Sequence, residues 1–207
     1  MKAYQRLLSY VKISTPSNEE SSSSPSSQCQ FDLARLLVEE LKGLGSLMCL
    51  WMNTVTFMHI FLLQKVWSTA KHWFYRSYGY GFRFLRPCSH TDDHRRYDGK
   101  ELPLGTSGRT LSPEMFPHLA SLAGRTLITS DGTTILGADD KAGIAEILTA
   151  LEHILTEKIP HGPLCVAFTP DEEIGMGPAH FDVKKFGADY AYTLDGDTEG
   201  RDPVRKL

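Results

Sequence analysis

The sequence predicts an α/β fold, because apolar segments of strand length alternate with a helical pattern in its second half. Residues 126–129, 164–168 and 190–194 are short apolar stretches, which predicts three strands. Residues 140–155 lie between the first two and predict a helix, with these side chains inward: Ile144, Ile147, Leu148, Leu151 and Leu155. The order strand, helix, strand is typical of a parallel sheet covered by helices.

The N-terminal part predicts two further helices. A helix over residues 3–13 would place Leu7, Leu8 and Val11 on one face, and residues 31–44 form an amphipathic helical pattern. Residues 19–28 are rich in Glu, Ser and Pro and predict an exposed loop. No internal repeat accompanies these elements.

Composition limits the class of protein. The 207 residues suffice for one sizeable core, and 22 basic against 25 acidic residues do not favour nucleic acid or an anionic membrane as a partner. The four cysteines (Cys29, Cys49, Cys88 and Cys165) have neither metal-ligand spacing nor a disulfide pattern. With no signal peptide evident at the start of the chain, we expect a cytoplasmic location.

Acidic residues follow the predicted strands at three places. The chain reads Gly-Ala-Asp-Asp-Lys-Ala-Gly over residues 137–143, Thr-Pro-Asp-Glu-Glu-Ile-Gly over residues 169–175, and Leu-Asp-Gly over residues 194–196. Open α/β sheets form their sites at the carboxyl ends of strands. Three such acidic turns therefore predict carboxylates that converge on a pair of metal ions.

The chemistry of a metal pair suggests a role for each carboxylate. Such a pair needs a bridging ligand, terminal ligands and a base for the attacking water. Asp139 would be the bridge, Glu173 and Asp195 the terminal ligands, and Glu172 the base. The alternative is ordinary capping, since carboxylates at a helix start also stabilise its N-terminus. His161 and His180 do not follow predicted strands, so we interpret both as surface or core residues rather than ligands.

These motifs resemble a known family. Residues 137–146, 159–175 and 180–196 are similar to the peptidase T family of tripeptide aminopeptidases, within the di-zinc aminoacylase/carboxypeptidase superfamily. Residues 7–16, 31–44 and 111–117 are also similar. The resemblance covers about two thirds of the chain.

The resemblance implies a cytosolic hydrolase that removes the N-terminal residue of tripeptides with two Zn²⁺ ions. It implies the same roles for Asp139, Glu172, Glu173 and Asp195 as the metal-pair chemistry does. Manganese or cobalt could replace zinc in such a carboxylate-rich site. The implied fold is an α/β catalytic domain interrupted by a lid domain that supports dimerisation. This chain would be a partial catalytic domain with the lid and dimerisation domain missing.

Two ligand histidines of the family have no counterpart in this chain. One belongs to a His-Met-Asp-Thr motif upstream of the bridging aspartate, whose aspartate would orient the histidine. The other lies beyond residue 207. The codons of residues 73–81, read without their first base, can encode Gly-Phe-Ile-Ala-His-Met-Asp-Thr, with the histidine codon across Ser77 and Tyr78. Shifted frames at residues 51–57 and 201–207 can likewise encode family-like sequence.

We therefore expect a peptidase gene with small insertions or deletions near residues 47, 67, 96 and 200. Residues 1–45 would be the N-terminal part of the catalytic domain and residues 46–96 an aberrant segment with no stable role. Residues 97–200 would be the metal-binding part and residues 201–207 an out-of-frame tail. A chain without both histidines should bind zinc weakly or not at all and should be inactive. A genuine insert of unusual composition is the alternative origin of residues 46–96.

Other functions remain open at this point. A different di-zinc peptidase or N-acyl amino acid hydrolase of the same superfamily would carry similar metal ligands. A non-enzymatic alternative uses residues 46–87, which are rich in apolar and aromatic side chains, as a membrane or binding arm. That segment is only marginal as a membrane span, because polar residues interrupt it. A third outcome is an unfolded product.

Overall fold

The structure is a computed structural model that describes residues 1–45, 48–51, 57–61, 72–78, 88, 90–187, 189 and 191–195. For the strands at 48–51, 57–61 and 72–78 it describes the backbone alone. The chain divides into two compact units, one made of Met1–Leu85 with Ala138–Leu207 and the other of Arg86–Gly137. Among the helices of the described residues, none has the length and apolar character needed to cross a membrane.

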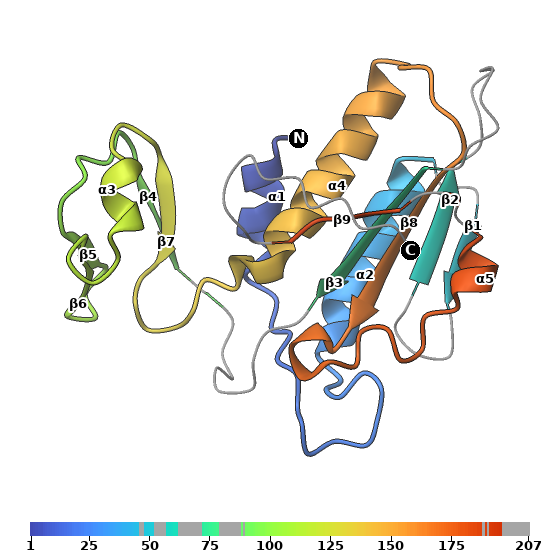
Figure 1. Cartoon of the computed structure of the whole chain (residues 1–207), viewed down its shortest axis with the longest axis horizontal. Coiled ribbons are helices and arrows are strands. Elements are labelled where there is room, and N and C mark those ends of the chain that lie inside the picture. The colour runs from blue at the N-terminus through green and yellow to red at the C-terminus, as the bar shows by residue number, and fades with distance from the viewer. Residues whose placement is uncertain are drawn as a thin grey trace. The chain divides into compact units, whose positions relative to one another are not determined.

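The predicted long helix is α4 (Ala138–Thr156), which lies against the sheet of the first unit (Figure 1). Ile144, Ile147, Leu148 and Leu151 are at most 1% exposed, and Leu155 packs at the edge of the same core. The helical spacing of these apolar side chains places them on one stripe that faces the core. The predicted helix and its inward face are therefore confirmed.

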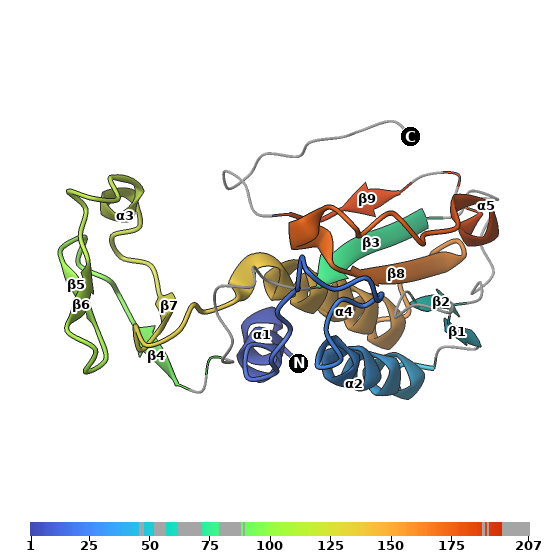
Figure 2. The same ribbon diagram turned by 90° about the horizontal axis from the view of Figure 1, so that it is seen from below.

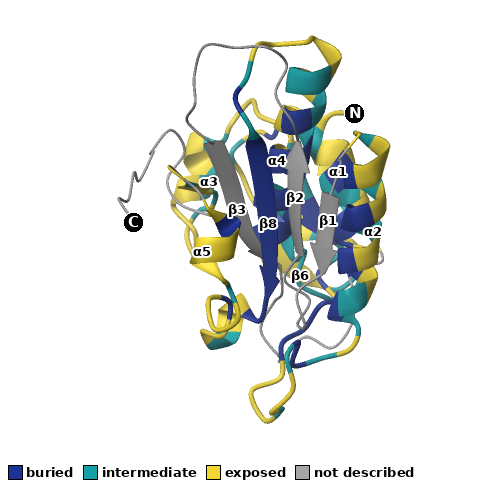
Figure 3. Ribbon diagram, turned by 90° about the vertical axis from the view of Figure 1, so that its right-hand side faces the viewer, coloured by how far each residue is buried: buried dark blue, intermediate teal, exposed yellow. Residues whose placement is uncertain are grey.

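A five-stranded sheet forms the centre of this unit, in the order β1-β2-β8-β3-β9. Its central strand is β8 (Leu164–Pro170), whose seven residues are all buried (Figure 3). A strand that is buried on both faces has a continuous run of apolar residues, and this run allowed β8 to be predicted from the sequence. β8 pairs antiparallel with β2 (Phe57–Phe61) and parallel with β3 (His72–Tyr78).

The expectation that residues 46–96 have no stable role does not hold for the strands that the structure describes in this segment. Three strands of this segment, β1 (Met48–Trp51), β2 and β3, belong to the sheet, and two of them flank β8. β8 can satisfy its backbone hydrogen bonds only with a strand on each side. Aromatic and β-branched residues suit that position whatever their origin. This pairing also argues against residues 46–87 as a separate membrane arm.

Three helices cover one face of the sheet (Figure 2). α1 (Ala3–Tyr10) and α2 (Gln30–Gly43) match the two helices predicted near the N-terminus. Their buried side chains join α4 and β8 in one core, which includes Tyr10, Leu33, Leu37, Leu41, Val166 and Phe168. The apolar stripe of each helix thus explains why all three lie on the same face.

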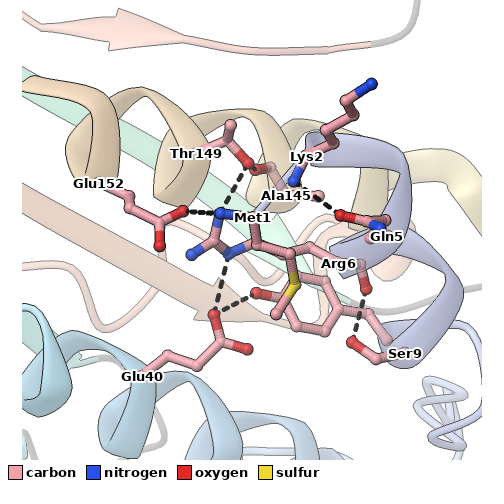
Figure 4. A network of polar contacts seen from close by, with 10 residues as sticks. Met1, Lys2, Gln5, Arg6, Ser9, Glu40, Ala145, Thr149 and Glu152 are labelled. Carbon is pink, nitrogen blue, oxygen red and sulfur yellow. Dashed lines mark hydrogen bonds and ion pairs between the residues drawn. The ribbon is translucent and has the colours of Figure 1, made fainter. Parts of the chain in front are cut away.

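A polar network joins the three helices at the edge of this core (Figure 4). Arg6 of α1 is 4% exposed and donates to Glu40 of α2 at 3.1 Å. It also donates to Thr149 at 2.9 Å and Glu152 at 3.1 Å, both on α4. Tyr10 donates its hydroxyl hydrogen to Glu40 at 2.9 Å. Buried polar groups need such partners, so this network sets how the helices meet.

The second unit contains two short antiparallel ladders. β4 (Thr91–His94) pairs with β7 (Leu127–Ser130), and β5 (Leu102–Leu104) pairs with β6 (Arg109–Leu111). α3 (His118–Ser121) lies between β6 and β7 in sequence. The strand predicted at residues 126–129 exists as β7. It does not precede α4 within the parallel sheet, as the α/β pattern suggested, because it pairs with β4 instead.

Candidate functional site

The acidic turn after β8 is a short 3₁₀ helix, η1 (Glu172–Ile174). Left-handed residues bound it on both sides, Asp171 with φ 60° and Gly175 with φ 72°. The amide of Gly175 donates to the Glu172 carbonyl at 2.7 Å, and that of Met176 to the Asp171 carbonyl at 2.9 Å. Glu172 and Glu173 are exposed. The turn therefore presents two adjacent carboxylates at the carboxyl end of β8.

Asp171, directly before these glutamates, is 1% exposed and is held by partners from the N-terminal region. The Ser26 amide donates to Asp171 Oδ2 at 2.8 Å, and the Ser26 hydroxyl donates to Oδ1. Gln30 Nε2 donates to Oδ1 at 2.7 Å, while the Asp171 amide donates to Gln30 Oε1 at 3.3 Å. A buried carboxylate needs several such donors to offset its lost hydration. These four bonds fix the start of the acidic turn.

The contact with Asp171 corrects the prediction for residues 19–28. The first part of this loop is exposed as expected, but Pro25 and Ser26 are buried. Ser26 is buried because it bonds a carboxylate 145 positions away in the sequence. The roles of Asp171, Ser26 and Gln30 were not predicted, since no local pattern in a Ser-rich stretch indicates a distant acceptor.

The Asp-Asp pair at the start of α4 separates into two roles. Asp140 is 8% exposed and accepts from the Gly143 amide at 3.1 Å, so it caps the helix. Asp139 is exposed. Both residues have non-helical backbone angles, and the peptide bond between them is cis. The capping interpretation is thus confirmed for Asp140, and Asp139 is left as the candidate ligand.

Lys141 ties the same helix start to the N-terminal region. Its side chain is completely buried, and its Nζ donates to the Ile13 carbonyl at 2.7 Å. A buried ammonium needs acceptors as a buried carboxylate needs donors. Residues 13–30 therefore contact both acidic turns, through Lys141 at the start of α4 and through Asp171 at the start of η1.

Asp195 follows β9 (Tyr192–Thr193) and is exposed. β9 is shorter than the strand predicted at residues 190–194, and it pairs parallel with β3, which pairs parallel with β8. The carboxyl ends of β8, β3 and β9 thus lie at one edge of the sheet. Glu172 and Glu173 follow β8 at this edge, and Asp195 follows β9.

The described residues do not complete a metal site. They contain no group of three or more His, Cys, Asp or Glu side chains placed to hold a metal ion. His161 lies before β8, at the end of the strand opposite Glu172, and its Nδ1 lies 2.7 Å from the Gly162 carbonyl oxygen. His180 is exposed and follows η1. The carboxylates suit a divalent ion by type, but the arrangement does not fit one.

Part of the chain is similar to a known peptidase family. Residues 131–203, which include all four predicted carboxylates, match the profile of Peptidase family M20/M25/M40. A peptidase T from Halothermothrix orenii is 44% identical over 211 residues, covering 94% of this chain and 48% of that relative. A peptidase T from Shouchella clausii is 45% identical over 202 residues, covering 95% and 48%.

Solved structures share the fold. A tripeptidase from Staphylococcus aureus matches with a TM-score of 0.66 at 20% identity, over 95% of this chain and 43% of its own. Aminopeptidase PepT from Bacillus cereus matches with a TM-score of 0.65 at 21% identity, over the same shares. At these identities the likeness concerns the fold alone. The chain spans about half the length of the curated relatives that it matches, 48% for the two named above.

Proposed function

We propose, because residues 131–203 match Peptidase family M20/M25/M40, that this chain derives from a tripeptide aminopeptidase of the peptidase T kind. In the intact enzyme the segment would supply carboxylates for two zinc ions, and tripeptides would be the substrates. We further propose that the chain as it stands is an inactive fragment of a cytosolic enzyme.

The edge of the sheet carries this proposal. Parallel pairing of β8, β3 and β9 brings the turn with Glu172 and Glu173 to the same edge as Asp195. We assign Glu173 and Asp195 as metal ligands and Asp139 as the bridging ligand. We assign Glu172, adjacent to a ligand, as the base that takes a proton from water. The position of Glu172, Glu173 and Asp195 at the carboxyl ends of β8 and β9 supports their roles, while the role of Asp139 rests on the motif at the start of α4.

The carboxyl end of β3 supports a shifted reading frame as the cause of the missing histidine. β3 lies between β8 and β9, and its register aligns Ser77 with Thr169 and Tyr78 with Pro170. The shifted frame can encode its histidine across the codons of Ser77 and Tyr78. A histidine there would start from the backbone position next to the acidic turn. The match between this position and the end of β3 favours a shifted frame over an unrelated insert.

The incomplete ligand set decides the expected activity. Zinc sites in proteins use three or four protein ligands with defined geometry, and both histidines of the proposed set are missing. We therefore derive no catalytic step for this chain and expect no turnover. If a shifted reading frame produced residues 46–96, this segment would replace the strands of the intact enzyme. It would still pair with β8 but would supply no metal ligand.

Two measurements test the proposal. The first measurement is to sequence the source DNA across codons 40–100 and 190–215. If codons 73–81 cannot encode His-Met-Asp-Thr in any reading frame, the proposed frameshift is refuted. The second incubates the purified 207-residue chain with a tripeptide and excess zinc, where release of the N-terminal residue would contradict the fragment assignment. An intact peptidase T assayed with a tripeptide and an N-acyl amino acid provides the positive control and tests the substrate class.

A further inference from the structure

Residues 13–30 connect two of the three acidic turns of the proposed site, those at Asp139 and at Glu172, and we refer to these residues as the N-terminal brace. Their contacts with Asp171 and Lys141 join chain segments that are more than 120 positions apart. We propose that the brace positions the acidic turns, and that Asp171 is the positioning residue for Glu172 and Glu173. The roles of the glutamates rest on the proposed function, while the brace itself is a property of the fold.

The carboxylate of Asp171 is held by three donors. Its two carboxylate oxygens accept from the Ser26 amide, the Ser26 hydroxyl and Gln30 Nε2. Bonds from neutral donors to a charged acceptor are stronger than those between neutral groups. The side chain is 1% exposed, so water cannot replace a lost partner without opening the turn.

The donors are themselves held in place. The Ser26 hydroxyl oxygen accepts from the Asn18 amide at 2.8 Å, and Gln30 Nε2 also donates to the Pro16 carbonyl at 3.3 Å. Gln30 is the first residue of α2 and is fully buried. The start of α2 and the loop before it therefore act on the carboxylate as one unit.

The backbone conformation of the turn explains why the N-terminal brace must hold Asp171. Asp171 has φ 60°, a left-handed conformation that Asp and Asn tolerate better than most residues. The chain reverses at this residue from a buried strand into an exposed turn of three residues. A helix this short has little stability of its own. The direction in which Glu172 and Glu173 leave the sheet is therefore set by the bonds at Asp171.

The substitution Asp171→Asn isolates this effect. Asn keeps the left-handed preference and the shape of the side chain but replaces one acceptor oxygen with an NH₂ donor. If the new NH₂ group faces Ser26, it opposes the hydrogen of the Ser26 amide. If it faces Gln30, it opposes the hydrogens of Gln30 Nε2. Turning the Gln30 amide only moves the conflict to the Asp171 amide hydrogen. Each arrangement leaves two donors opposed inside a buried site.

Residue-resolved hydrogen exchange of the full chain, without added metal, tests the proposal. The amides of Gly175 and Met176 report the turn, and those of Val166 and Ala167 in β8 report global opening. We expect Asp171→Asn to speed exchange in the turn by about 10- to 100-fold while β8 exchange changes by less than about twofold. Gln30→Ala, which removes the partner and leaves Asp171 intact, should loosen the same amides. Ser26→Ala should have a smaller effect, because it keeps the amide donor.

Asp182→Asn is the matched control. Asp182 accepts from the Lys185 amide at 2.9 Å at the start of α5 (Val183–Phe186), so the same chemical change occurs at an exposed turn. It should leave the amides of Gly175 and Met176 unchanged. Unchanged turn exchange in both Asp171→Asn and Gln30→Ala would overturn the proposal. Equal acceleration of hydrogen exchange in the turn and in β8 would also overturn the proposal, since the brace would then contribute only to global stability.

The experiment separates the brace from the proposed function. A zinc titration of the wild-type chain that perturbs the Glu172 and Glu173 resonances at a saturable concentration would contradict the expected loss of the zinc site, and the exchange result for the brace would still stand. If Asp171→Asn does not fold, Gln30→Ala and Ser26→Ala give the result by themselves, because neither opposes two donors in the buried site and each leaves Asp171 with other donors.

Discussion

Arg6 and Glu40 join the first two helices through a 3.1 Å hydrogen bond, and the Arg6 side chain is 4% exposed. The same guanidinium donates to Thr149 and Glu152 on α4. Burial by itself would lower the pKa of Arg6, but its bonds to Glu40 and Glu152 outweigh this and raise it. One side chain thus joins three helices that share one core.

Arg6→Met tests the weight of this network. Met keeps most of the apolar length of the side chain but removes the donor that Glu40, Thr149 and Glu152 share. We expect a loss of about 2–3 kcal/mol in the free energy of unfolding, measured by urea denaturation. The control is Arg35→Met, since Arg35 pairs with Asp32 where both side chains are more than 60% exposed. Such a pair contributes less than about 1 kcal/mol, so equal losses in the two variants would contradict the prediction.

Gly143→Ala should destabilise the protein although it lies within a helix. A Cβ at Gly143 would stand 2.6 Å from Asp140 Oδ2, inside the buried cap of α4. We expect a loss of about 1–2 kcal/mol, because the cap must shift. Gly43→Ala at the end of α2 is the matched control, where a Cβ meets nothing within 4 Å. Ala is the better helix former, so this variant should gain up to about 1 kcal/mol in thermal or urea unfolding. A gain at both positions would refute the clash.

Glu152 should make stability depend on pH. Its bond to the N-terminal amine, followed by that to Arg6, lowers the pKa of Glu152 below the usual value of 4.5. A carboxylate with a lowered folded pKa contributes stability above its unfolded pKa, and this contribution is lost as pH falls through the folded pKa. The stability difference between wild type and Glu152→Gln should therefore shrink as the pH is lowered from 7 to 3.

The control for this pH series is Glu39→Gln. Glu39 pairs with Lys42 on an exposed helix surface, where ion pairs contribute little. A difference for Glu152→Gln that stays constant down to pH 3, or grows, would show that its contacts do not favour the charged carboxylate.

Zinc should not stabilise this chain. A ligand that binds only the folded state adds about 2.7 kcal/mol at a hundredfold excess over its Kd, which raises Tm by several degrees. With two histidine ligands missing from the proposed set, we expect a Tm shift below about 1 °C in thermal melts at millimolar zinc. An intact peptidase T melted with and without zinc serves as the control. A saturable rise in Tm for this chain would show that its carboxylates bind the metal without those histidines.

Local pattern was enough for much of the fold. The helical repeat in α4 and the apolar run of β8 were predicted nearly to their bounds, because burial of one stripe or of both faces leaves a periodic trace in sequence. The two N-terminal helices were predicted for the same reason. β9 was predicted too long, and β7 was expected in the wrong sheet, since a short apolar run does not specify its pairing partner.

The site was predicted by residue type and only partly by position. Three acidic turns were visible in the sequence, and two of them lie at one edge of the sheet because β8 and β9 run parallel to β3. The assignment of ligands to Asp139, Glu173 and Asp195, and of the base to Glu172, remains a prediction. No local signal marked Asp171 as more buried than its two acidic neighbours.

The sequence by itself determined the helices, the central strand and the identity of the acidic residues, since these depend on neighbours a few positions apart. Only the tertiary structure decided that Asp140 is buried and Asp139 exposed, and that Ser26 reaches Asp171. It also decided that a segment of unusual composition pairs with β8. Burial and hydrogen-bond partners come from segments far apart in the chain, so the cost of leaving a polar group or a strand edge unpaired appears only after the chain has packed.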